Sequence, residues 1–413
     1  MSGGRPLDGR IVLDLTTALA GPYATLLLAG LGARVIKVEN PSRGGDTSRN
    51  NSPYATAEGL SARRRGERDL SVSMMLRGRN KQSMTLNLKS PDGVEVFRRL
   101  AAEADVVVEN YSAGVTTRLG IDHESLREVN PRLVYTSISG FGAQGGPGTG
   151  KAMDTIIQAL SGVMMTAGEP DDGPVRFGLP VGDLVAPLFA TIGTLAALVE
   201  VDRGGEGQHV DVSMLGALTS LVACEPFDAF EELGMATRTG AFVPRLAPFG
   251  TFRARDGWFA LCGPTDEFAH GVFAAIGNPE LADDERFARR DGRVANADEI
   301  HRLVSAWAAG RDVSEATKAL DAHGVPSAPV RSTAEAVRDP LVLERGEVVR
   351  LTHPDHGDVG DLYGSGLPIR FSASDSRIDG PAPALGEHTD AVLRELLDLS
   401  DDHIAELRRS GVV

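Results

Sequence analysis

Residues 11–39 read IVLDLTTALAGPYATLLLAGLGARVIKVE, and this stretch decides the fold class. It begins and ends with short apolar segments, 11–15 and 33–39, that are typical of buried strands, and the residues between them favour a helix. Pro22 suits the first turn of that helix. Further apolar strands are expected at 83–88, 106–110, 133–139 and 209–213. Strands that alternate with helices predict an α/β fold with a mainly parallel sheet covered on both faces.

The length of 413 residues predicts two domains, because a single hydrophobic core stops growing at about 250–300 residues. A long, nearly uncharged helix is expected at 184–201, and a hairpin around Asp256-Gly257 marks a change of character after residue 222. The predicted divisions are a first domain at 1–222, a smaller α+β middle domain at 223–330, and a return linker that begins a third segment at 331–413. An amphipathic helical tail is expected at 389–408.

The chain is acidic, with a net charge of −15 and a pI ≈ 5.1. This balance argues against a nucleic-acid-binding protein, although a local cluster of cations can still bind an anionic ligand. Cys224 and Cys262 have no metal-binding spacing, so we expect reduced thiols and no metal site. The N-terminus lacks an apolar signal core and no uninterrupted apolar run reaches about 18 residues, so we expect a cytoplasmic protein without membrane spans.

An irregular stretch at 41–72 contains an arginine-rich loop at 61–69. Its arginines are Arg63, Arg64, Arg65 and Arg68. The simplest interpretation is a solvated, mobile loop. A lid, or a loop that holds an anionic substrate, is the alternative that the sequence leaves open.

Three well-known motifs are missing from the chain. Glu39 ends the second expected strand, where a ribose-binding acid would stand in a dinucleotide-binding fold. The preceding turn, LTTALAGPYA, contains only Gly21, whereas a G-x-G-x-x-G turn is needed for the backbone to approach a pyrophosphate. A P-loop and a G-x-S-x-G nucleophile elbow are also absent. Covalent catalysis by this chain would therefore use a different side chain, and the carboxylates are the candidates.

Two aspartates precede apolar helical segments. Asp154 stands in GKAMDTIIQALSG and Asp183 stands in GLPVGDLVAPL. Each could simply be a helix N-cap, a position that Asp favours. A helix N-terminus also stabilises the ionised carboxylate, which is the nucleophilic form. The pattern alone leaves open whether Asp154 is a cap, a nucleophile or both, and whether Asp183 is a cap or a general acid or base.

Segments spread over the whole chain carry a family resemblance. In chain order they include LDGRIVLDLT, LGARVIKVENP, RNKQSMTLNLKSPDG, ADVVVENYSAGV, NPRLVYTSISGFG, MDTIIQALSG, GDLVAP, GGEGQHVDVSM, GVPSAPV, DPLVLERG and GEHTDAVLRELL. With these segments the chain resembles the class III CoA-transferases (the CaiB/BaiF family), which include formyl-CoA and succinyl-CoA:carboxylate transferases. The resemblance implies a large Rossmann-like domain completed by residues 331–413, a small middle domain, and an interlocked homodimer.

The resemblance also implies a reaction through aspartyl intermediates. A carboxylate attacks an acyl-CoA to give an acyl–aspartyl anhydride, CoA then forms an aspartyl-CoA thioester, and an acceptor acid reverses the steps. Taken through the MDTIIQALSG segment, the resemblance implies that Asp154 is the nucleophile, with Asp183 as a second acid. The partners are acyl-CoA and a small carboxylic acid, with no permanently bound cofactor. Succinyl-CoA is the expected donor because it is common in the family.

Carried over position by position, the resemblance implies a set of CoA contacts. Arg118 corresponds to an arginine that reaches the CoA phosphates, whose oxygens suit the fork of a guanidinium. The other implied CoA-binding residues are Ala18, Leu19, Asn80, Lys81, Asn110 and Tyr111. Gly140 is a candidate for stabilising the oxyanion of the tetrahedral intermediates. Arg245 is a candidate for binding a second carboxylate of the acceptor acid.

The chain also departs from related enzymes. The formyl-CoA enzymes have Gln where this chain has Leu19, Arg where it has Asn40, and a run of glycines that is missing here, so oxalate and formate specificity is not expected. The same fold hosts α-methylacyl-CoA racemases, whose His–Asp pair moves an α-proton. Met153 occupies the position of that His and cannot act as a base, although the racemase Asp matches Asp183. A non-catalytic CoA-binding paralogue is the third interpretation.

Overall fold

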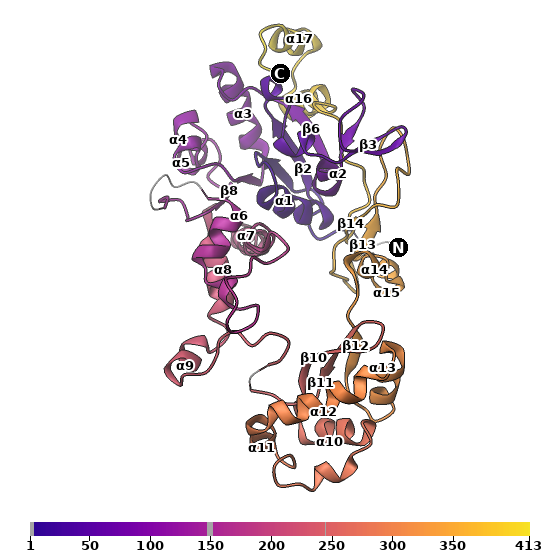
Figure 1. Ribbon diagram of the computed structural model, residues 1–413. Helices are drawn as coiled ribbons and strands as arrows, with labels where there is room; N and C mark the ends of the chain where they lie inside the picture. The colour runs from indigo at the N-terminus through magenta and orange to yellow at the C-terminus, as the bar shows by residue number, and fades with distance from the viewer. Residues whose placement is uncertain (1–3, 147–151, 244) are drawn as a thin grey trace. The chain divides into compact units, whose positions relative to one another are not determined.

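The computed structural model describes residues 4–146, 152–243 and 245–413 (Figure 1). The chain forms two compact units, and their boundaries were partly predictable. The larger unit comprises the chain up to Ser161, Gly178–Leu221 and Val337–Val413, and the smaller comprises Gly162–Phe177 and Val222–Ala336. The boundary expected after residue 222 is placed one residue earlier, and the return to the larger unit comes at 337 rather than 331.

The segment 162–177 belongs to the smaller unit, although the sequence pattern places it in the first domain. Arg238 explains the difference, because its guanidinium donates hydrogen bonds to the backbone carbonyls of Pro170 (3.0 Å) and Gly173 (2.6 Å). These contacts join two segments that are more than sixty residues apart in the sequence. Periodicity within either segment carries no information about such a link.

A six-stranded parallel sheet forms the centre of the larger unit, as the alternating strand and helix signals predict. The strand order is β6-β2-β1-β7-β8-β9. The strands are β1 (Ile11–Asp14), β2 (Arg34–Glu39), β6 (Lys81–Thr85), β7 (Val106–Glu109), β8 (Val134–Ser139) and β9 (His209–Ser213). The register pairs Val12 with Val35 on one side and with Val106 on the other, so short apolar runs stack at the middle of the sheet.

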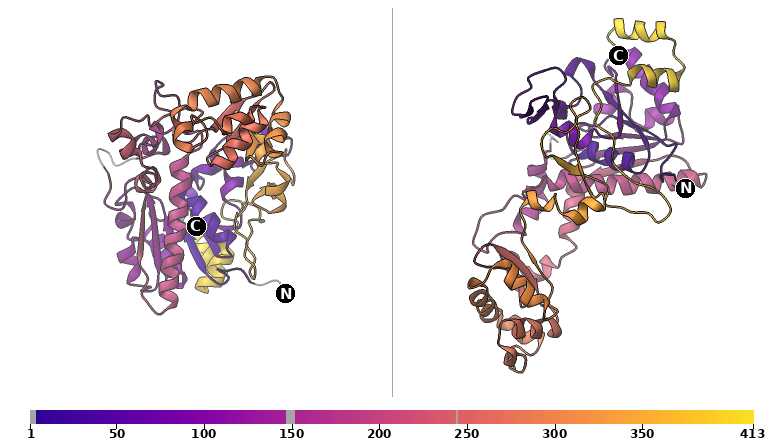
Figure 2. Two further views of the ribbon diagram at one scale, coloured as in Figure 1. Left: turned by 90° about the horizontal axis from the view of Figure 1, so that it is seen from below. Right: turned by 90° about the vertical axis from the view of Figure 1, so that its right-hand side faces the viewer.

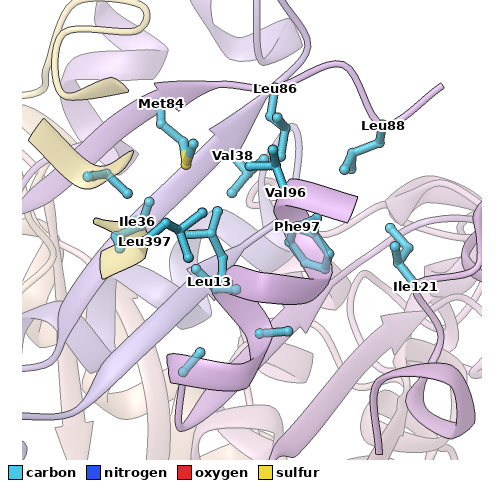
Figure 3. Packing of buried hydrophobic residues seen from close by; sticks show 14 of the residues in the cluster. Leu13, Ile36, Val38, Met84, Leu86, Leu88, Val96, Phe97, Ile121 and Leu397 are labelled. Atoms are coloured by element: carbon cyan, nitrogen blue, oxygen red, sulfur yellow. The ribbon is translucent and has the colours of Figure 1, made fainter. Parts of the chain in front are cut away.

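Both faces of this sheet are covered by helices. Leu13 and Ile36 point to a core that also contains Phe97 and Leu397, and Figure 3 shows these side chains in contact range. The neighbouring Val12 and Val35 point to the opposite core. The first face is covered by α3 (Pro91–Glu103) and α16 (Thr389–Leu397), and the second by α1 (Ala20–Gly30) and α7 (Val181–Asp202). Strand residues alternate between the two faces, which is why the strands read as continuous apolar runs.

The remaining elements of the larger unit are short. They are α2 (Val72–Arg77), α4 (Val115–Leu119), α5 (His123–Arg127), α6 (Asp154–Leu160), α8 (Met214–Val222), α15 (Pro340–Glu344), α17 (Asp401–Arg409), and the strands β3 (Tyr54–Thr56), β4 (Gly59–Ser61), β5 (Leu70–Ser71), β13 (Val348–Arg350) and β14 (Tyr363–Ser365). Strands β4, β3 and β5 form a small antiparallel sheet within the stretch that we expected to be irregular.

The helical tail expected at 389–408 is confirmed, and it consists of two helices, α16 and α17. Asp398 ends α16 in the left-handed backbone region, at φ 53°, which a helix cannot continue. Ser400 then caps α17, where its side chain accepts a hydrogen bond from the His403 amide. The apolar periodicity runs through both helices and hides the break.

The smaller unit is built around a three-stranded antiparallel sheet, β10-β11-β12. The hairpin expected around Asp256-Gly257 is confirmed, since β10 (Phe249–Arg253) pairs with β11 (Trp258–Cys262). Helices cover this sheet over a core that includes Phe252, Phe259 and Phe273. The other elements are β12 (Ser327–Pro329), α9 (Phe227–Glu232), α10 (Asp266–Ala275), α11 (Arg290–Ala295), α12 (Ala297–Ala309), α13 (Val313–Asp321) and α14 (Thr333–Ala336).

Helix α7 is the longest helix of the described chain, with 22 residues, and Figure 2 shows it as one continuous rod. It is long and apolar enough to cross a membrane, although the sequence predicted no membrane span. Core helices of globular proteins have the same composition, and 44% of its most apolar window is buried in the chain. Its remaining apolar surface includes Ile192, whose exposure is 62%.

Candidate active site

A cavity of about 350 Å³ lies at the carboxyl ends of β1, β7 and β8. Open parallel sheets bind their ligands at this edge, because the loops that follow the strands converge there. The starts of α1, α6 and α7 complete its wall. The predicted site residues that line it are Ala18, Leu19, Asn110, Tyr111, Gly140, Asp154 and Asp183.

Asp154 is held by two hydrogen bonds, one to each carboxylate oxygen. Oδ1 accepts a hydrogen bond from the Gly182 amide at 2.8 Å, and Oδ2 accepts one from Gln158 Nε2 at 2.7 Å. Asp154 is the first residue of α6, and the cap position before it is occupied by Met153. The predicted N-cap of its own helix is therefore wrong, because the carboxylate satisfies an amide in the first turn of α7 instead.

Asp183 is the third residue of α7 and not its N-cap, a position that Pro180 occupies. Its carboxylate has no hydrogen-bond partner among the described residues. Burial and the negative charge of Asp154 together raise the pKa of Asp183 to about 6, while the positive charge of Arg77 opposes both effects. Asp183 is thus a half-buried carboxylate that is more basic than usual and has oxygens available to a ligand.

The two aspartates therefore play different structural parts in one cavity. The Asp154 carboxylate accepts a hydrogen bond that holds the first turn of α7, whereas Asp183 lies in that turn and lines the cavity. The helix amides behind Asp183 favour its ionised form, while burial and Asp154 keep its basicity high. A carboxylate of this kind can attack a carbonyl carbon, or it can take up a proton near neutral pH.

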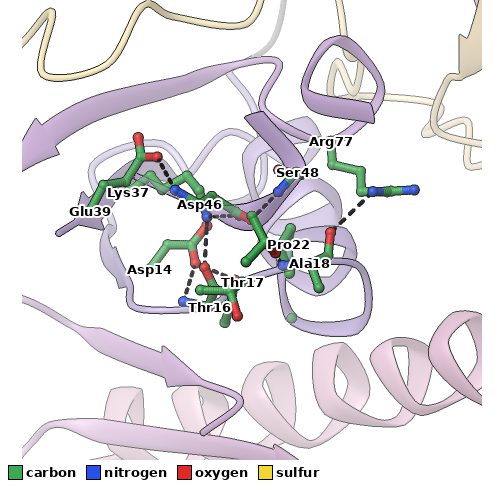
Figure 4. A network of polar contacts seen from close by, with 12 residues as sticks. Asp14, Thr16, Thr17, Ala18, Pro22, Lys37, Glu39, Asp46, Ser48 and Arg77 are labelled. Carbon is green, nitrogen blue, oxygen red and sulfur yellow. Dashed lines mark hydrogen bonds and ion pairs between the residues drawn. The ribbon is translucent and has the colours of Figure 1, made fainter. Parts of the chain in front are cut away.

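Residues 17–19 form a strip that lines the cavity, and Figure 4 labels two of them, Thr17 and Ala18. Ala18 has a left-handed backbone, at φ 68°, which is uncommon for any residue other than glycine. Its amide donates to Asp46 Oδ1 at 3.0 Å, and its carbonyl accepts from Arg77 Nη1 at 3.1 Å. Asn110 clamps Thr17 with two hydrogen bonds of 2.9 Å, one to each backbone group. These contacts hold the strip in a conformation that the chain would otherwise avoid.

A buried ionic network lies behind this strip, and Figure 4 shows most of its members. The Lys37 ammonium lies 2.7 Å from Asp46 Oδ2 and also donates to the Thr16 carbonyl. Lys81 lies 3.0 Å from Asp14 Oδ2, and both side chains are fully buried. Lys37 and Lys81 hold the pKa of Asp14 well below its usual range despite its complete burial. The network fixes the Asp46 carboxylate and therefore the Ala18 amide.

Asn80 and Lys81 do not line the cavity, so the structure does not place them as direct CoA contacts. The Lys81 ammonium is fully buried and bonds to Asp14, Thr25 and the Pro22 carbonyl. The Asn80 side chain binds backbone groups of residues 377, 379 and 380. Both residues stabilise the chain behind the site. A role of this turn in binding CoA stays a prediction.

A second cavity, of about 860 Å³, shares Thr17, Tyr111 and Ser112 with the first. Arg118 lines it, and its contact with the CoA phosphates stays a prediction. Arg43 and Lys89 also line it, and the sequence analysis did not single them out. Each follows a strand at the same sheet edge as Arg118, and that spacing was the signal that could have found them.

Tyr111 and Gly140 have clear structural reasons for their identities. The Tyr111 amide donates to Glu109 at 2.7 Å, and burial raises the pKa of the Tyr111 hydroxyl to about 12, so it stays protonated. A Cβ atom at Gly140 would lie 2.2 Å from the Cβ of Ala152, so only glycine fits there. The carbonyl of Gly140 accepts a hydrogen bond from the Leu215 amide. Its role at an oxyanion stays a prediction.

Arg245 lies in the smaller unit, where its guanidinium is 2.8 Å from Glu225 and stacks over the Phe230 ring. It is therefore engaged within its own unit, and its binding to an acceptor acid stays a prediction. In the arginine-rich loop, Arg65 pairs with Glu58 at 2.5 Å and Arg64 donates to the Arg49 carbonyl at 2.8 Å. The loop is thus tied to its neighbours at these points.

Metal binding has no support from side-chain clustering. Among residues 4–146, 152–243 and 245–413, no group of three or more His, Cys, Asp and Glu side chains is arranged to hold a metal ion. The carboxylates of the cavity are Asp154 and Asp183 alone. The chemistry that the described residues offer is that of a positioned carboxylate beside a cation-lined cavity.

Comparisons with known proteins identify the family of the chain. Residues 7–389 match the family described as CoA-transferase family III. The succinate–glutarate CoA-transferase of Agrobacterium fabrum is 35% identical over 394 residues, covering 95% of this chain and 96% of that protein. The human succinyl-CoA:glutarate CoA-transferase is 33% identical, covering 100% of this chain and 91% of that protein.

A solved structure of a related protein has the same fold over nearly the whole length of this chain. A CaiB/BaiF family protein from Brucella suis superposes with a TM-score of 0.80 and 33% identity, covering 95% of this chain and all of that chain. An acetyl-CoA:oxalate CoA-transferase from Acetobacter aceti is 35% identical, with 94% and 95% of the two chains covered. The chain therefore belongs to CoA-transferase family III, the CaiB/BaiF family, and is a CoA-transferase.

Proposed function

We propose that the protein moves CoA from an acyl-CoA donor, succinyl-CoA foremost, to a second carboxylic acid, with Asp183 as the attacking carboxylate. The observation that carries this proposal is the Asp183 side chain, a basic carboxylate without a hydrogen-bond partner among the described residues, in the wall of a cavity at the sheet edge. The names of several relatives, which act on succinyl-CoA, glutarate and related acids, support the choice of donor.

The choice of Asp183 over Asp154 follows from their hydrogen bonds. The sequence resemblance pointed to Asp154, yet both oxygens of that side chain already accept hydrogen bonds from Gly182 and Gln158. Attack by Asp154 would break at least one of these contacts and release the first turn of α7. Asp183 can attack without this cost, and its raised pKa makes it more nucleophilic than an ordinary aspartate.

The reaction then proceeds in balanced steps. An Asp183 oxygen attacks the thioester carbonyl, the C–S bond breaks, and an acyl–aspartyl anhydride and CoA thiolate form. The thiolate attacks the Asp183 carbonyl carbon and releases the donor acid, leaving an aspartyl-CoA thioester. The acceptor carboxylate displaces the thiolate to form a second anhydride. The thiolate finally attacks the acceptor acyl carbon, and Asp183 is regenerated. No water takes part, so the thioester energy is conserved.

The second cavity fits the larger part of CoA. Its volume of about 860 Å³ suits a nucleotide with its linker, and it joins the Asp183 cavity along Thr17 and Tyr111. Arg118, Arg43 and Lys89 offer the positive charge that the CoA phosphates need on an otherwise acidic protein. Coenzyme A is in this proposal a substrate, and no resident cofactor is required.

Racemisation of an acyl-CoA is the main competing reaction. A racemase needs two groups that move a proton on opposite faces of the α-carbon. Asp183 could supply one, but Met153 supplies no base at the position before Asp154, and its side chain is 77% exposed. The third interpretation, a non-catalytic CoA-binding protein, would leave the raised pKa of Asp183 without a use.

A homodimer is part of the proposal. Apolar side chains on α6 and α7 remain exposed in the single chain, a surface that soluble monomers rarely leave open. They are Ile156, Leu160, Leu188, Phe189, Ile192 and Val199. We propose that a second copy of the chain covers them, in the interlocked arrangement that the family resemblance implies, and that the protein works in the cytoplasm.

The test is a matrix of acyl-CoA donors against carboxylic acids, read by mass spectrometry of the CoA esters. The proposal predicts a new acyl-CoA only when donor and acceptor are both present, with succinyl-CoA among the best donors. The same acyl-CoA incubated alone in D₂O should show no α-deuterium. Deuterium uptake without an acceptor acid would instead support a racemase.

A further inference from the structure

Arg77 is a cation beside the cavity that contains Asp183, and no carboxylate of the described residues forms an ion pair with it. It is the last residue of α2, and its side chain is half-buried. Nη1 donates to the Ala18 carbonyl at 3.1 Å, as Figure 4 shows. Among the described residues the guanidinium makes no ion pair, and its other nitrogens have no hydrogen-bond partner. Ala18 itself lines the cavity that contains Asp183.

Three buried cations of the same region are paired with carboxylates, whereas Arg79 is buried without an ion pair among the described residues and donates to the carbonyls of Leu76 and Ser365. Lys37 lies 2.7 Å from Asp46, Lys81 lies 3.0 Å from Asp14, and Arg49 lies 2.6 Å from Glu39. Each of these pairs removes the cost of burying a charge. Burial lowers the pKa of Arg77, so the protein does not solvate this guanidinium fully. An anionic ligand would supply the missing partner.

Arg77 and Asp183 are linked through Ala18, since Arg77 donates to the Ala18 carbonyl, and Ala18 and Asp183 line the same cavity. The charge of Arg77 lowers the pKa of Asp183, and that of Asp183 raises the pKa of Arg77. An acyl group attached to Asp183 therefore extends into the field of this guanidinium. The strip at Ala18 is fixed by Asp46 and Asn110, so its carbonyl holds Arg77 at a defined position.

We propose that Arg77 binds the distal carboxylate of a dicarboxylic acyl group carried by Asp183, and so makes the enzyme prefer dicarboxylic to monocarboxylic acids. This inference rests on the proposed role of Asp183. A guanidinium presents a planar fork of N–H donors that matches a carboxylate, and the pair is strongest in a partly desolvated site. Arg77 is accordingly a residue of specificity, and it takes no part in bond making.

The experiment compares two acids of equal length, glutarate and pentanoate. Each is exchanged, as the isotopically labelled free acid, with its own CoA ester, so that donor and acceptor always belong to one class. We expect the wild-type enzyme to prefer glutarate, and Arg77→Met to lower kcat/KM for glutarate at least 30-fold, mainly through KM. Pentanoate exchange should change less than 3-fold. Arg77→Lys should recover part of the glutarate rate, because it restores the charge without the fork.

Comparing the two acids shows whether Arg77 determines substrate specificity or only has a structural role. If Arg77 only held the Ala18 carbonyl, Arg77→Met would slow both acids equally, and that result would overturn the proposal. An unchanged glutarate KM, or a wild-type enzyme that prefers pentanoate, would overturn it as well. Arg409→Met, which removes an exposed arginine at the end of α17, is the matched control and should leave both exchanges unaltered.

Binding of the free acids distinguishes a failure of this inference from a failure of the proposed reaction. Thermal shifts with glutarate and with pentanoate are measured for the wild type and Arg77→Met. A glutarate shift that disappears in Arg77→Met supports the inference even if no exchange occurs, in which case only the proposed reaction fails. An equal glutarate shift in both proteins overturns the inference even if the wild type is active.

Discussion

At the scale of single residues, Asp154 and Asp183 have different roles in one cavity. Asp154 and Asp183 line the same cavity, and only Asp183 has oxygens without a hydrogen-bond partner in the described chain. We expect Asp183→Ala to reduce CoA transfer by about 10³-fold or more, because the nucleophile is removed. Asp154→Asn should cost about 10- to 100-fold, because Asn can still accept from Gly182 while the charge is lost.

The assignment of roles is tested by measuring the steady-state transfer rates of both variants with one donor and one acceptor. Circular dichroism is the control that both variants remain folded. A greater loss in Asp154→Asn than in Asp183→Ala would return the nucleophilic role to Asp154.

The pH dependence of transfer follows from the same carboxylate. Burial and Asp154 raise the pKa of Asp183 to about 6, and only the ionised form attacks. The transfer rate should therefore fall as the pH decreases through about 6, about two pH units above the range of an ordinary aspartate. A pH profile of kcat/KM for the acyl-CoA, taken from pH 4.5 to 8, measures this. A profile that stays flat down to pH 5 would contradict the raised pKa.

Stability should respond to Asp183 in the opposite direction to activity. The raised pKa means that the folded state binds the proton more tightly than the unfolded state, so ionising Asp183 costs stability above pH 6. Asp183→Asn removes this cost, and we expect about 1–3 kcal/mol more stability at pH 7.5. The difference should shrink as the pH falls from about 6 to 4. Urea unfolding at several pH values tests this, and a variant less stable than wild type at pH 7.5 would contradict it.

The sequence identified both aspartates but could not assign their roles. Each stands before an apolar helix, so their local patterns are nearly the same. The contact that separates them joins Asp154 to the amide of Gly182, 28 residues away, and no local pattern carries that information. Lys81 is a similar case, because its burial against Asp14 depends on the pairing of β1, β2 and β6.

At the scale of elements, the strip at 17–19 shows how the network behind it shapes the cavity. The Asp46 carboxylate accepts a hydrogen bond from the Ala18 amide and neutralises the Lys37 ammonium. Both interactions are lost if this carboxylate is removed. We expect Asp46→Ala to destabilise the fold by about 3–5 kcal/mol, because it leaves a buried ammonium with one partner fewer. Urea unfolding measures the loss. Asp379→Ala, which changes a half-exposed aspartate in a surface pair with Arg5 and Arg377, is the control and should stay within about 1 kcal/mol.

A loss below about 1 kcal/mol for Asp46→Ala would show that Lys37 finds another partner, and the network would not be what holds the strip.

Elements with strong apolar patterns were the predictable ones. All six strands of the parallel sheet were expected within a few residues, because buried strands are continuous apolar runs. The helical tail at 389–408 is confirmed, but its break at Asp398 was not predicted, since the periodicity continues across it. The small sheet β4-β3-β5 was missed because its strands have only two or three residues.

At the scale of the whole molecule, the exposed apolar side chains of α6 and α7 are the main unsatisfied feature. We propose that a second copy covers them, and Ile192→Glu should then weaken self-association, because it places a charge in an apolar interface. Sedimentation at micromolar concentrations compares the variant with the wild type. Val129→Glu changes a less exposed valine outside α6 and α7 and is the control. A monomeric wild type would contradict the proposed homodimer.

The division into two units was predicted only in outline. The change of character near residue 222 marks one boundary, but the inclusion of 162–177 in the smaller unit depends on contacts made by Arg238. Fold and reaction class are thus accessible from patterns along the chain. The assignment of roles within the cavity requires the contacts between distant segments.

Locating the covalent intermediate shows which aspartate is the nucleophile. The enzyme is incubated with succinyl-CoA, the activated carboxylate is trapped with hydroxylamine, and the modified peptide is sequenced by mass spectrometry. The account predicts a hydroxamate on Asp183, in the peptide that contains GLPVGDLVAPL. A hydroxamate on Asp154 instead, with Asp183 unmodified, would contradict it.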